Sequence, residues 1–239
     1  MEKEYLTICE NVAIIKNNIE KALGRSGRSD GVTFLAATKM NSAERINAAI
    51  KSGVSVIGEN RVQELLEKYD GIDKDGISIH FIGHLQTNKV KYIIDKVCMI
   101  HSVDSMKLAQ EIDKRAGQHG LTMDILIQVN AAQEESKFGI TTDDTKQLIL
   151  DILEQCPNVR IRGLMHIAPA ADDPNEVREY FTQVKDLYEE CGKIEHPHLD
   201  FKYLSMGMSH DFGVAIEEGS NLIRVGTSIF GERDYSKKN

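Results

Sequence analysis

The chain has 239 residues, of which 41% are hydrophobic and 28% are charged, and its formal net charge at pH 7 is -8. This length fits one large domain or two small ones, and no Ser/Gly-rich or low-complexity tract marks a linker. The negative charge argues against a broad nucleic-acid or anionic-membrane surface, and no apolar run approaches the ~20 residues of a membrane span, so we expect a small-molecule partner.

Strands and helices are expected to alternate along the chain. An amphipathic pattern over residues 5–23 predicts an N-terminal helix that ends at Gly24. Strands are expected at 32–40, 54–57, 77–82, 97–103, 123–129, 159–167, 199–204 and 222–230. Helices are expected between them, at 43–52, 60–69, 85–95, 104–116, 142–153, 173–191 and 209–218. Asn60, Asp104 and Asp173 are expected to cap the helices that they begin.

Eight strands that alternate with helices point to a (β/α)8 barrel of the TIM type, with a doubly wound open sheet as the main alternative. Only nine residues follow Phe230, so the last outer helix is expected to be missing or very short. The helix at 5–23 is expected to cover that gap. We therefore expect residues 1–239 to form a single barrel domain.

Polar residues stand where the predicted strands end. In (β/α)8 barrels the functional groups lie at the carboxyl ends of the strands. Here those positions hold Lys39, Asn60, His84, Asn130, His166, Ser205 and Arg224. Some of them have an ordinary structural explanation as well: Asn60 as a helix cap, His84 as a loop residue and His166 as a core histidine.

Lys39 ends an apolar run that reads as the first strand. An amine near an apolar interior tends to lose its charge, and a neutral amine is the nucleophile that forms Schiff bases with carbonyl compounds and with pyridoxal phosphate. The alternative is a strand-end lysine whose ammonium group reaches solvent.

The loops after the seventh and eighth strands are the usual phosphate site of this fold. Gly207 and Gly226 let backbone amides approach an anion, and the hydroxyls of Ser205 and Thr227 can donate hydrogen bonds. A helix expected from Ser209 offers further N–H groups. These two loops are therefore candidates for a phosphate cradle.

Arg224 lies within the apolar eighth strand, where a buried guanidinium needs an acceptor to offset a desolvation cost of several kcal/mol. A structural carboxylate partner is one explanation. The other is a cofactor, because a phosphate cradle that faces an amine is the geometry that pyridoxal phosphate requires, with Arg224 at the pyridine nitrogen. An arginine there does not readily accept a proton, so the ring nitrogen would stay unprotonated and the cofactor would be a weak electron sink.

Several motifs occur in order between the first strand and Gly231. They are Ala37-Thr38-Lys39, Ile57–Glu64, His80–Lys89, Arg162–Met165, Leu204–Ser209 and Arg224–Gly231. Together they resemble the pyridoxal phosphate homeostasis proteins, the YggS/PROSC family. The resemblance implies a barrel like the N-terminal domain of alanine racemase, with pyridoxal 5'-phosphate held as a Schiff base on Lys39.

The resemblance also implies which other residues contact the cofactor. These are Asn60, Ser205, Gly207, Arg224, Gly226 and Thr227. His84 and His166 are candidates for lining the site, but the family pattern implies no direct role for either.

The first functional hypothesis is a protein of intracellular pyridoxal phosphate homeostasis, which holds the cofactor without a dedicated reaction and hands it to apo enzymes. The alternative is a pyridoxal phosphate-dependent amino-acid racemase or related enzyme of low activity. In alanine racemases one catalytic base comes from a C-terminal β-domain of the partner subunit, and this chain, which ends at Asn239, is expected to lack that domain. This favours a monomer and a binding role, and leaves His166 as the one candidate for residual proton transfer.

A third hypothesis is an aldolase-like barrel that forms a Schiff base with a sugar phosphate, but no acid/base carboxylate stands out at the strand ends. The four cysteines form no CxxC pair, which favours reduced thiols over disulfides or a zinc site. The N-terminus is charged rather than apolar. We therefore expect a cytoplasmic protein without a metal site.

Overall fold

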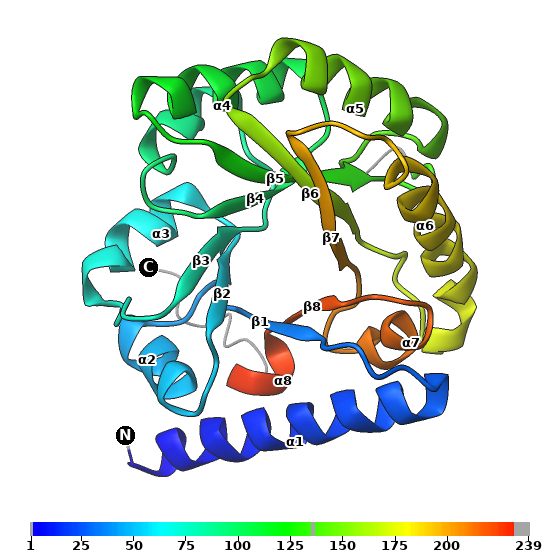
Figure 1. Cartoon of the computed structure of the whole chain (residues 1–239). Coiled ribbons are helices and arrows are strands. Elements are labelled where there is room, and N and C mark those ends of the chain that lie inside the picture. The colour runs from blue at the N-terminus through cyan, green and yellow to red at the C-terminus, as the bar shows by residue number, and fades with distance from the viewer. Residues whose placement is uncertain (1, 135–136, 232–239) are drawn as a thin grey trace.

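Eight parallel strands close into a barrel in which β8 pairs with β1 (Figure 1). The computed structural model describes residues 2–134 and 137–231. The strands are β1 (Thr33–Ala37), β2 (Val56–Glu59), β3 (Ser78–Phe81), β4 (Met99–Val103), β5 (Met123–Val129), β6 (Val159–His166), β7 (Leu199–Ser205) and β8 (Leu222–Val225). The predicted (β/α)8 architecture is confirmed, and the open-sheet alternative is wrong.

The helices surround this ring of strands (Figure 1). They are α1 (Glu2–Ser26), α2 (Ala43–Lys51), α3 (Val62–Lys68), α4 (Met106–Gln118), α5 (Thr142–Gln155), α6 (Arg178–Cys191), α7 (Phe212–Glu217) and α8 (Thr227–Phe230). Short 3-10 helices occur at η1 (Tyr69–Gly71), η2 (Thr87–Tyr92) and η3 (Pro174–Val177). None of the described helices is long and apolar enough to cross a membrane.

The apolar core lies in two places because strand side chains alternate between the two faces of the sheet. Outward-facing residues such as Ala36 and Ile57 join the large core between strands and helices. Inward-facing residues form smaller clusters inside the barrel, one around Leu35 and Leu222 and another around Met165. The interior is therefore filled by side chains, as is usual for this fold.

The helix α1 packs beside α2, α7 and the four-residue α8, on the side where the last outer helix is short (Figure 1). Ile8, Val12, Ile15 and Ile19 are buried at helical spacing on its inner face. The Asn11 Nδ2 group also donates a hydrogen bond of 2.8 Å to the carbonyl of Ile229. The helix thus covers the expected gap, and it starts before and ends after the range 5–23.

Several local predictions were wrong. The α-helix expected at 85–95 is instead the 3-10 helix η2, which is shorter and spans Thr87–Tyr92. The residue at the start of α3 is Arg61 rather than Asn60, and the one at the start of α4 is Ser105 rather than Asp104. The actual N-cap of each helix therefore lies one residue after the predicted cap, and the helices begin at Val62 and Met106.

The predicted cap at Asp173 is confirmed. Its Oδ1 atom accepts a hydrogen bond of 2.9 Å from the backbone N–H of Asn175, at the start of η3. The proline in the first turn supports the same helix start, because its ring fixes a suitable φ and its missing N–H costs no helical hydrogen bond there.

Candidate functional site

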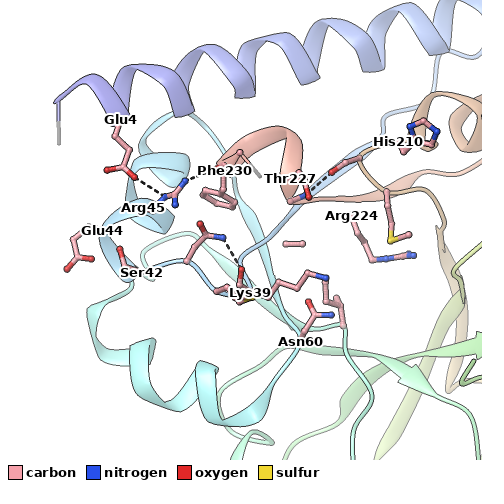
Figure 2. Close-up of a pocket in the computed structure, with 18 of the residues that line it drawn as sticks. Glu4, Lys39, Ser42, Glu44, Arg45, Asn60, His210, Arg224, Thr227 and Phe230 are labelled. Carbon is pink, nitrogen blue, oxygen red and sulfur yellow. Dashed lines mark hydrogen bonds and ion pairs between the residues drawn. The ribbon is translucent and has the colours of Figure 1, made fainter. Parts of the chain in front are cut away.

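A cavity of about 1020 Å³ opens at the carboxyl ends of β1, β2 and β8 (Figure 2). The residues of the predicted site that line it are Lys39, Asn60, Arg224, Gly226 and Thr227. They follow or end strands that lie far apart in the sequence, and closure of the barrel between β8 and β1 brings them together. The cavity extends outward to α1 and α2.

Lys39 follows the end of β1 by two residues, at the rim of the barrel. Its side chain extends into the cavity on the side of Asn60 and Arg224 (Figure 2). An amine in this position faces any ligand that occupies the cavity.

Arg224 is 5% exposed, and it is held by uncharged acceptors rather than by a carboxylate. Its Nη1 atom donates to the backbone oxygen of Ser205 at 2.8 Å and to Ser205 Oγ at 2.6 Å, and its Nη2 atom donates to the carbonyl of His166 at 2.8 Å. Burial lowers the pKa of Arg224 to about 10, which leaves the guanidinium charged at neutral pH. Among the described residues no carboxylate forms a direct ion pair with it, although the nearby Asp211 carboxylate partly offsets the effect of burial on its pKa. A direct carboxylate partner therefore does not explain its burial.

Ser205 and Gly207 lie behind this guanidinium and are not part of the cavity lining. The Ser205 side chain is fully buried and accepts from Arg224. Gly207 has a φ of +91°, and a Cβ atom there would lie 2.7 Å from the Cβ of Ala215, so the glycine lets the loop after β7 pack against α7. The structure places both residues where they support Arg224.

The predicted phosphate end of the cavity is formed by Gly226, Thr227 and Ser209. Ser209 Oγ accepts hydrogen bonds from the backbone N–H groups of Gly226 at 3.3 Å and Ser228 at 3.4 Å. A Cβ atom on Gly226 would lie 3.0 Å from the backbone oxygen of Ala37, so a side chain at this position would crowd the cavity wall. Hydroxyl and amide groups are thus concentrated at one end.

The helix after β7 begins at Phe212, not at Ser209 as predicted. Asp211 Oδ1 accepts a hydrogen bond of 2.6 Å from the backbone N–H of Met208, which holds residues 208–211 in a turn. Ser209 is therefore a loop residue whose hydroxyl, rather than its helix position, contributes to the site.

Asn60 contributes an unsatisfied polar atom. Its Oδ1 atom is buried and has no hydrogen-bond partner among the described residues. A Cβ atom on Gly83 would lie only 2.1 Å from the backbone oxygen of Asn60, so the glycine allows the two strand ends to approach. An amide oxygen buried beside a cavity without a partner indicates a place for a ligand donor.

The two candidate histidines lie elsewhere. His84 is exposed and stacks on Phe138, with ring centroids 3.7 Å apart, and it does not line the cavity. His166 faces the outer layer, where its ring meets the edge of Phe181 of α6 and its Nδ1 atom bonds the carbonyl of Val129 at 2.9 Å. Both were predicted as possible lining of the site, but the lining of this cavity includes neither, and the pleat turns His166 away from the barrel interior.

Arg45 and His210 are cavity residues that the sequence did not reveal. Arg45 on α2 pairs with Glu4 of α1 at 3.2 Å and donates to the carbonyl of Phe230 (Figure 2). In the sequence it is an ordinary helix-surface arginine. His210 is exposed, and its Nε2 atom bonds the carbonyl of Asp172 at 3.0 Å. The one sequence feature that could have indicated its place in the cavity is its position just after the loop that contains Gly207.

The described residues contain no group of three or more His, Cys, Asp or Glu side chains that could hold a metal ion. The reactive groups of the site are an amine, a charged guanidinium, and a cluster of hydroxyl and amide donors. An amine facing a fixed cation can bind an anionic carbonyl compound.

Known proteins are similar to this chain over nearly its whole length. Residues 11–234 match the family described as alanine racemase, N-terminal domain. The pyridoxal phosphate homeostasis protein of Aquifex aeolicus is 44% identical over 234 residues, which cover 96% of this chain and 100% of that protein. The protein of the same name from Escherichia coli K12 is 36% identical over 236 residues, 97% of this chain and 99% of the relative.

Solved structures show the same fold. A structure of PipY from Synechococcus elongatus, described as having PLP bound, is 33% identical in sequence with a TM-score of 0.80. The match covers 94% of this chain and 100% of the PipY chain. Alanine racemase of Clostridium difficile is 14% identical, with a TM-score of 0.67, and the match covers 96% of this chain and 59% of the racemase chain. This likeness shows a shared fold alone. This chain therefore belongs to the family of pyridoxal phosphate homeostasis proteins, which is built on the barrel of the alanine racemase N-terminal domain.

Proposed function

We propose that this protein binds pyridoxal 5'-phosphate covalently through Lys39 and acts in pyridoxal phosphate homeostasis without a dedicated reaction. The observation that carries the proposal is that Lys39, Arg224 and Thr227 line one cavity. The names of the relatives and the description of PipY with PLP bound support it.

The residues of the cavity fit this cofactor. When bound, pyridoxal phosphate supplies an aldehyde that an amine can attack and a ring that withdraws electrons. Lys39 offers the amine, and the buried Oδ1 atom of Asn60 offers an acceptor that no described residue satisfies. The hydroxyls of Ser209 and Thr227 suit a phosphate group.

Each supporting residue has a distinct task in this proposal. Arg224 orients the pyridine ring from a position fixed by Ser205, and Gly207 keeps the loop behind it closely packed. Gly226 leaves room for the phosphate, which Thr227 binds. The barrel with its N-terminal helix works as a single domain, in the cytoplasm and as a monomer.

The proposed role is holding and transfer rather than turnover. Arg224 stays charged and gives no proton to the ring nitrogen, so the cofactor remains a weak electron sink. His166, the residue first considered for proton transfer, lies outside the cavity lining. An accessible cavity mouth also suits delivery to apo enzymes, which are the proposed recipients.

The first experiment is the visible absorption spectrum of the protein with pyridoxal phosphate, before and after borohydride reduction, followed by peptide mapping. Wild type should carry a reduced pyridoxyl group on Lys39, and Lys39→Ala should not. If Lys39→Ala carried as much reduced pyridoxyl group as wild type, attached to other lysines, the proposed site would be refuted.

A second assay separates holding from catalysis. The loaded protein is incubated with L-alanine and other amino acids, and chiral products are measured. Racemisation above that of free pyridoxal phosphate would favour the enzyme alternative. Transfer is measured as activation of an apo enzyme, compared with free cofactor at the same free concentration.

A further inference from the structure

The residues around Lys39 form a tight turn. The backbone N–H of Asn41 donates to the carbonyl of Thr38 at 3.1 Å, so Lys39 and Met40 are the two central residues of a β-turn. The Asn41 side chain also donates from Nδ2 to the carbonyl of Lys39 at 3.0 Å (Figure 2). The direction in which Lys39 leaves the barrel rim therefore depends on this turn.

The turn contains a backbone conformation that is unfavourable for its residue. Met40 has a φ of +60°, and it is one of the non-glycine residues with positive φ in the described chain. Turns with positive φ at this position usually have glycine or asparagine there, and a side chain costs on the order of 1 kcal/mol or more. Such a conformation persists only when neighbouring groups hold it.

Lys68 of α3 supplies much of that support. Its side chain is 10% exposed, and its Nζ atom donates to the carbonyls of Thr38 at 3.0 Å and Asn41 at 3.2 Å, the two ends of the turn. It also pairs with Glu59 at 2.7 Å. An ammonium group has three donors, so these bonds use its full capacity.

Two carboxylates complete the arrangement. Glu64 Oε2 accepts a hydrogen bond of 2.7 Å from the backbone N–H of Met40, the residue with the unfavourable φ. Glu59 is fully buried and accepts from the hydroxyl of Thr38 as well as from Lys68. Glu59, Glu64 and Lys68 therefore contact the turn on both sides of Lys39.

We propose that Glu59, Glu64 and Lys68 form a clamp that positions Lys39 for covalent attachment of pyridoxal phosphate. This inference rests on the proposed function and adds positioning residues to it. Lys68 is the centre of the clamp because it joins both ends of the turn to the buried carboxylate. The clamp acts through backbone geometry and contacts no ligand, since none of its three residues lines the cavity.

The test compares Glu64→Ala with Glu64→Gln. Glutamine keeps an oxygen for the Met40 N–H group and alanine does not, and the side chain of Glu64 is 20% exposed, so both variants should fold. We expect attachment of pyridoxal phosphate to Lys39 to be about tenfold or more slower in Glu64→Ala, since small misplacements of a reacting group have effects of this size. Glu64→Gln should stay near wild type.

Pyridoxine phosphate, which has an alcohol in place of the aldehyde, tests the rest of the cavity in the same variants. Its affinity should be unchanged, because the clamp acts only on the turn. In the protein without ligand, amide hydrogen exchange at Met40 should be faster in Glu64→Ala. A general loosening of the structure would instead weaken pyridoxine phosphate binding as well.

A rescue experiment tests the strain directly. Glycine adopts positive φ without cost, so adding Met40→Gly to Glu64→Ala should restore a large part of the attachment rate. Lys68→Met should also slow attachment of the cofactor to Lys39. Because this change leaves the Glu59 carboxylate buried without its partner, a double variant with Glu59→Gln is measured as well. Lys146→Met, which removes an exposed ion pair with Glu190, is the control and should react like wild type.

The outcomes separate the two proposals. If wild type attaches the cofactor on Lys39 and Glu64→Ala attaches it equally fast, or Met40→Gly gives no recovery, the clamp is refuted and the proposed function stands. If wild type fails to attach the cofactor, the proposed function is refuted, and the clamp's role in attachment with it.

Discussion

Arg224 shows how a buried charge can be kept available for a ligand. Two backbone carbonyls and the Ser205 hydroxyl accept from two of its nitrogen atoms, and these neutral acceptors leave its charge uncompensated by any described ion pair. A carboxylate partner would have neutralised the group. Neutral acceptors hold the guanidinium in place while its positive charge still acts on the cavity.

Arg224→Gln should therefore weaken pyridoxal phosphate binding while Lys39 remains able to react. Loss of a hydrogen bond to a charged group corresponds to roughly 1.5–3 kcal/mol, or about a 10- to 100-fold rise in Kd. His166→Asn is the matched control, because that residue contributes only its backbone carbonyl to Arg224. Equal effects of the two changes, measured by titration of absorbance, would place the ring away from Arg224.

At the scale of elements, α1 takes the place of an outer helix. A barrel strand needs an apolar cover on its outer face, and the four-residue α8 is too short to provide one after β8. The apolar stripe of α1 supplies it, and the hydrogen bond from Asn11 to Ile229 ties the helix to α8. Among the described residues, α1 thus covers the outer face that α8 is too short to cover.

Adjacent isoleucines of α1 provide a direct test of this cover. Ile15 is 2% exposed and Ile14 is 56% exposed. Ile15→Ala should lower the free energy of unfolding by about 2–5 kcal/mol, because it removes buried methyl groups and leaves a cavity. Ile14→Ala should change it by about 0.5 kcal/mol or less. If denaturant unfolding gave similar changes in the free energy of unfolding for the two variants, α1 would contribute little to the stability of the fold.

The barrel buries several histidines in their neutral form. Burial lowers the pKa of His80 and of His166 to about 4, and it lowers the pKa of His101 well below its ordinary value. His80 Nδ1 and His101 Nε2 lie 2.9 Å apart, a contact that requires one of these nitrogens to be unprotonated. The folded state therefore resists protonation that the unfolded chain accepts.

Stability should fall as pH decreases from about 6.5, the ordinary histidine pKa, toward 4. In that window the unfolded chain binds protons that the folded protein does not, so acid favours unfolding. For a single histidine this linkage amounts to roughly 2 kcal/mol between neutral pH and pH ~5.

His166→Asn tests this linkage, because the asparagine amide can still donate to the carbonyl of Val129 but does not titrate. The free energy of unfolding is measured by denaturant titration at neutral and at acidic pH. It should decrease less on acidification for the variant than for wild type. An identical pH dependence would mean that the pKa of His166 is the same in the folded protein as in the unfolded chain, which would contradict the prediction.

From the sequence alone one could predict eight alternating strands and helices, a barrel with an open sheet as the alternative, and the placement of polar groups at the strand ends, among them Lys39, Asn60, Arg224, Gly226 and Thr227. This was possible because parallel strands that alternate with helices place all their carboxyl ends on the same side. The covering role of α1 also followed from the apolar period of the first helix, whereas the eighth strand, expected to reach residue 230, ends at Val225 and is followed by α8.

The direction of the side chains and the contacts that hold them became clear from the folded structure. The pleat turned His166 outward, and the packing of the loop after β7 put Ser205 behind Arg224 rather than in the cavity. The contact of Lys68 with the turn around Lys39 joins residues about 30 positions apart through a helix whose surface pattern looks ordinary. Side-chain direction at strand ends depends on neighbours distant in the sequence, and periodicity carries no information about them.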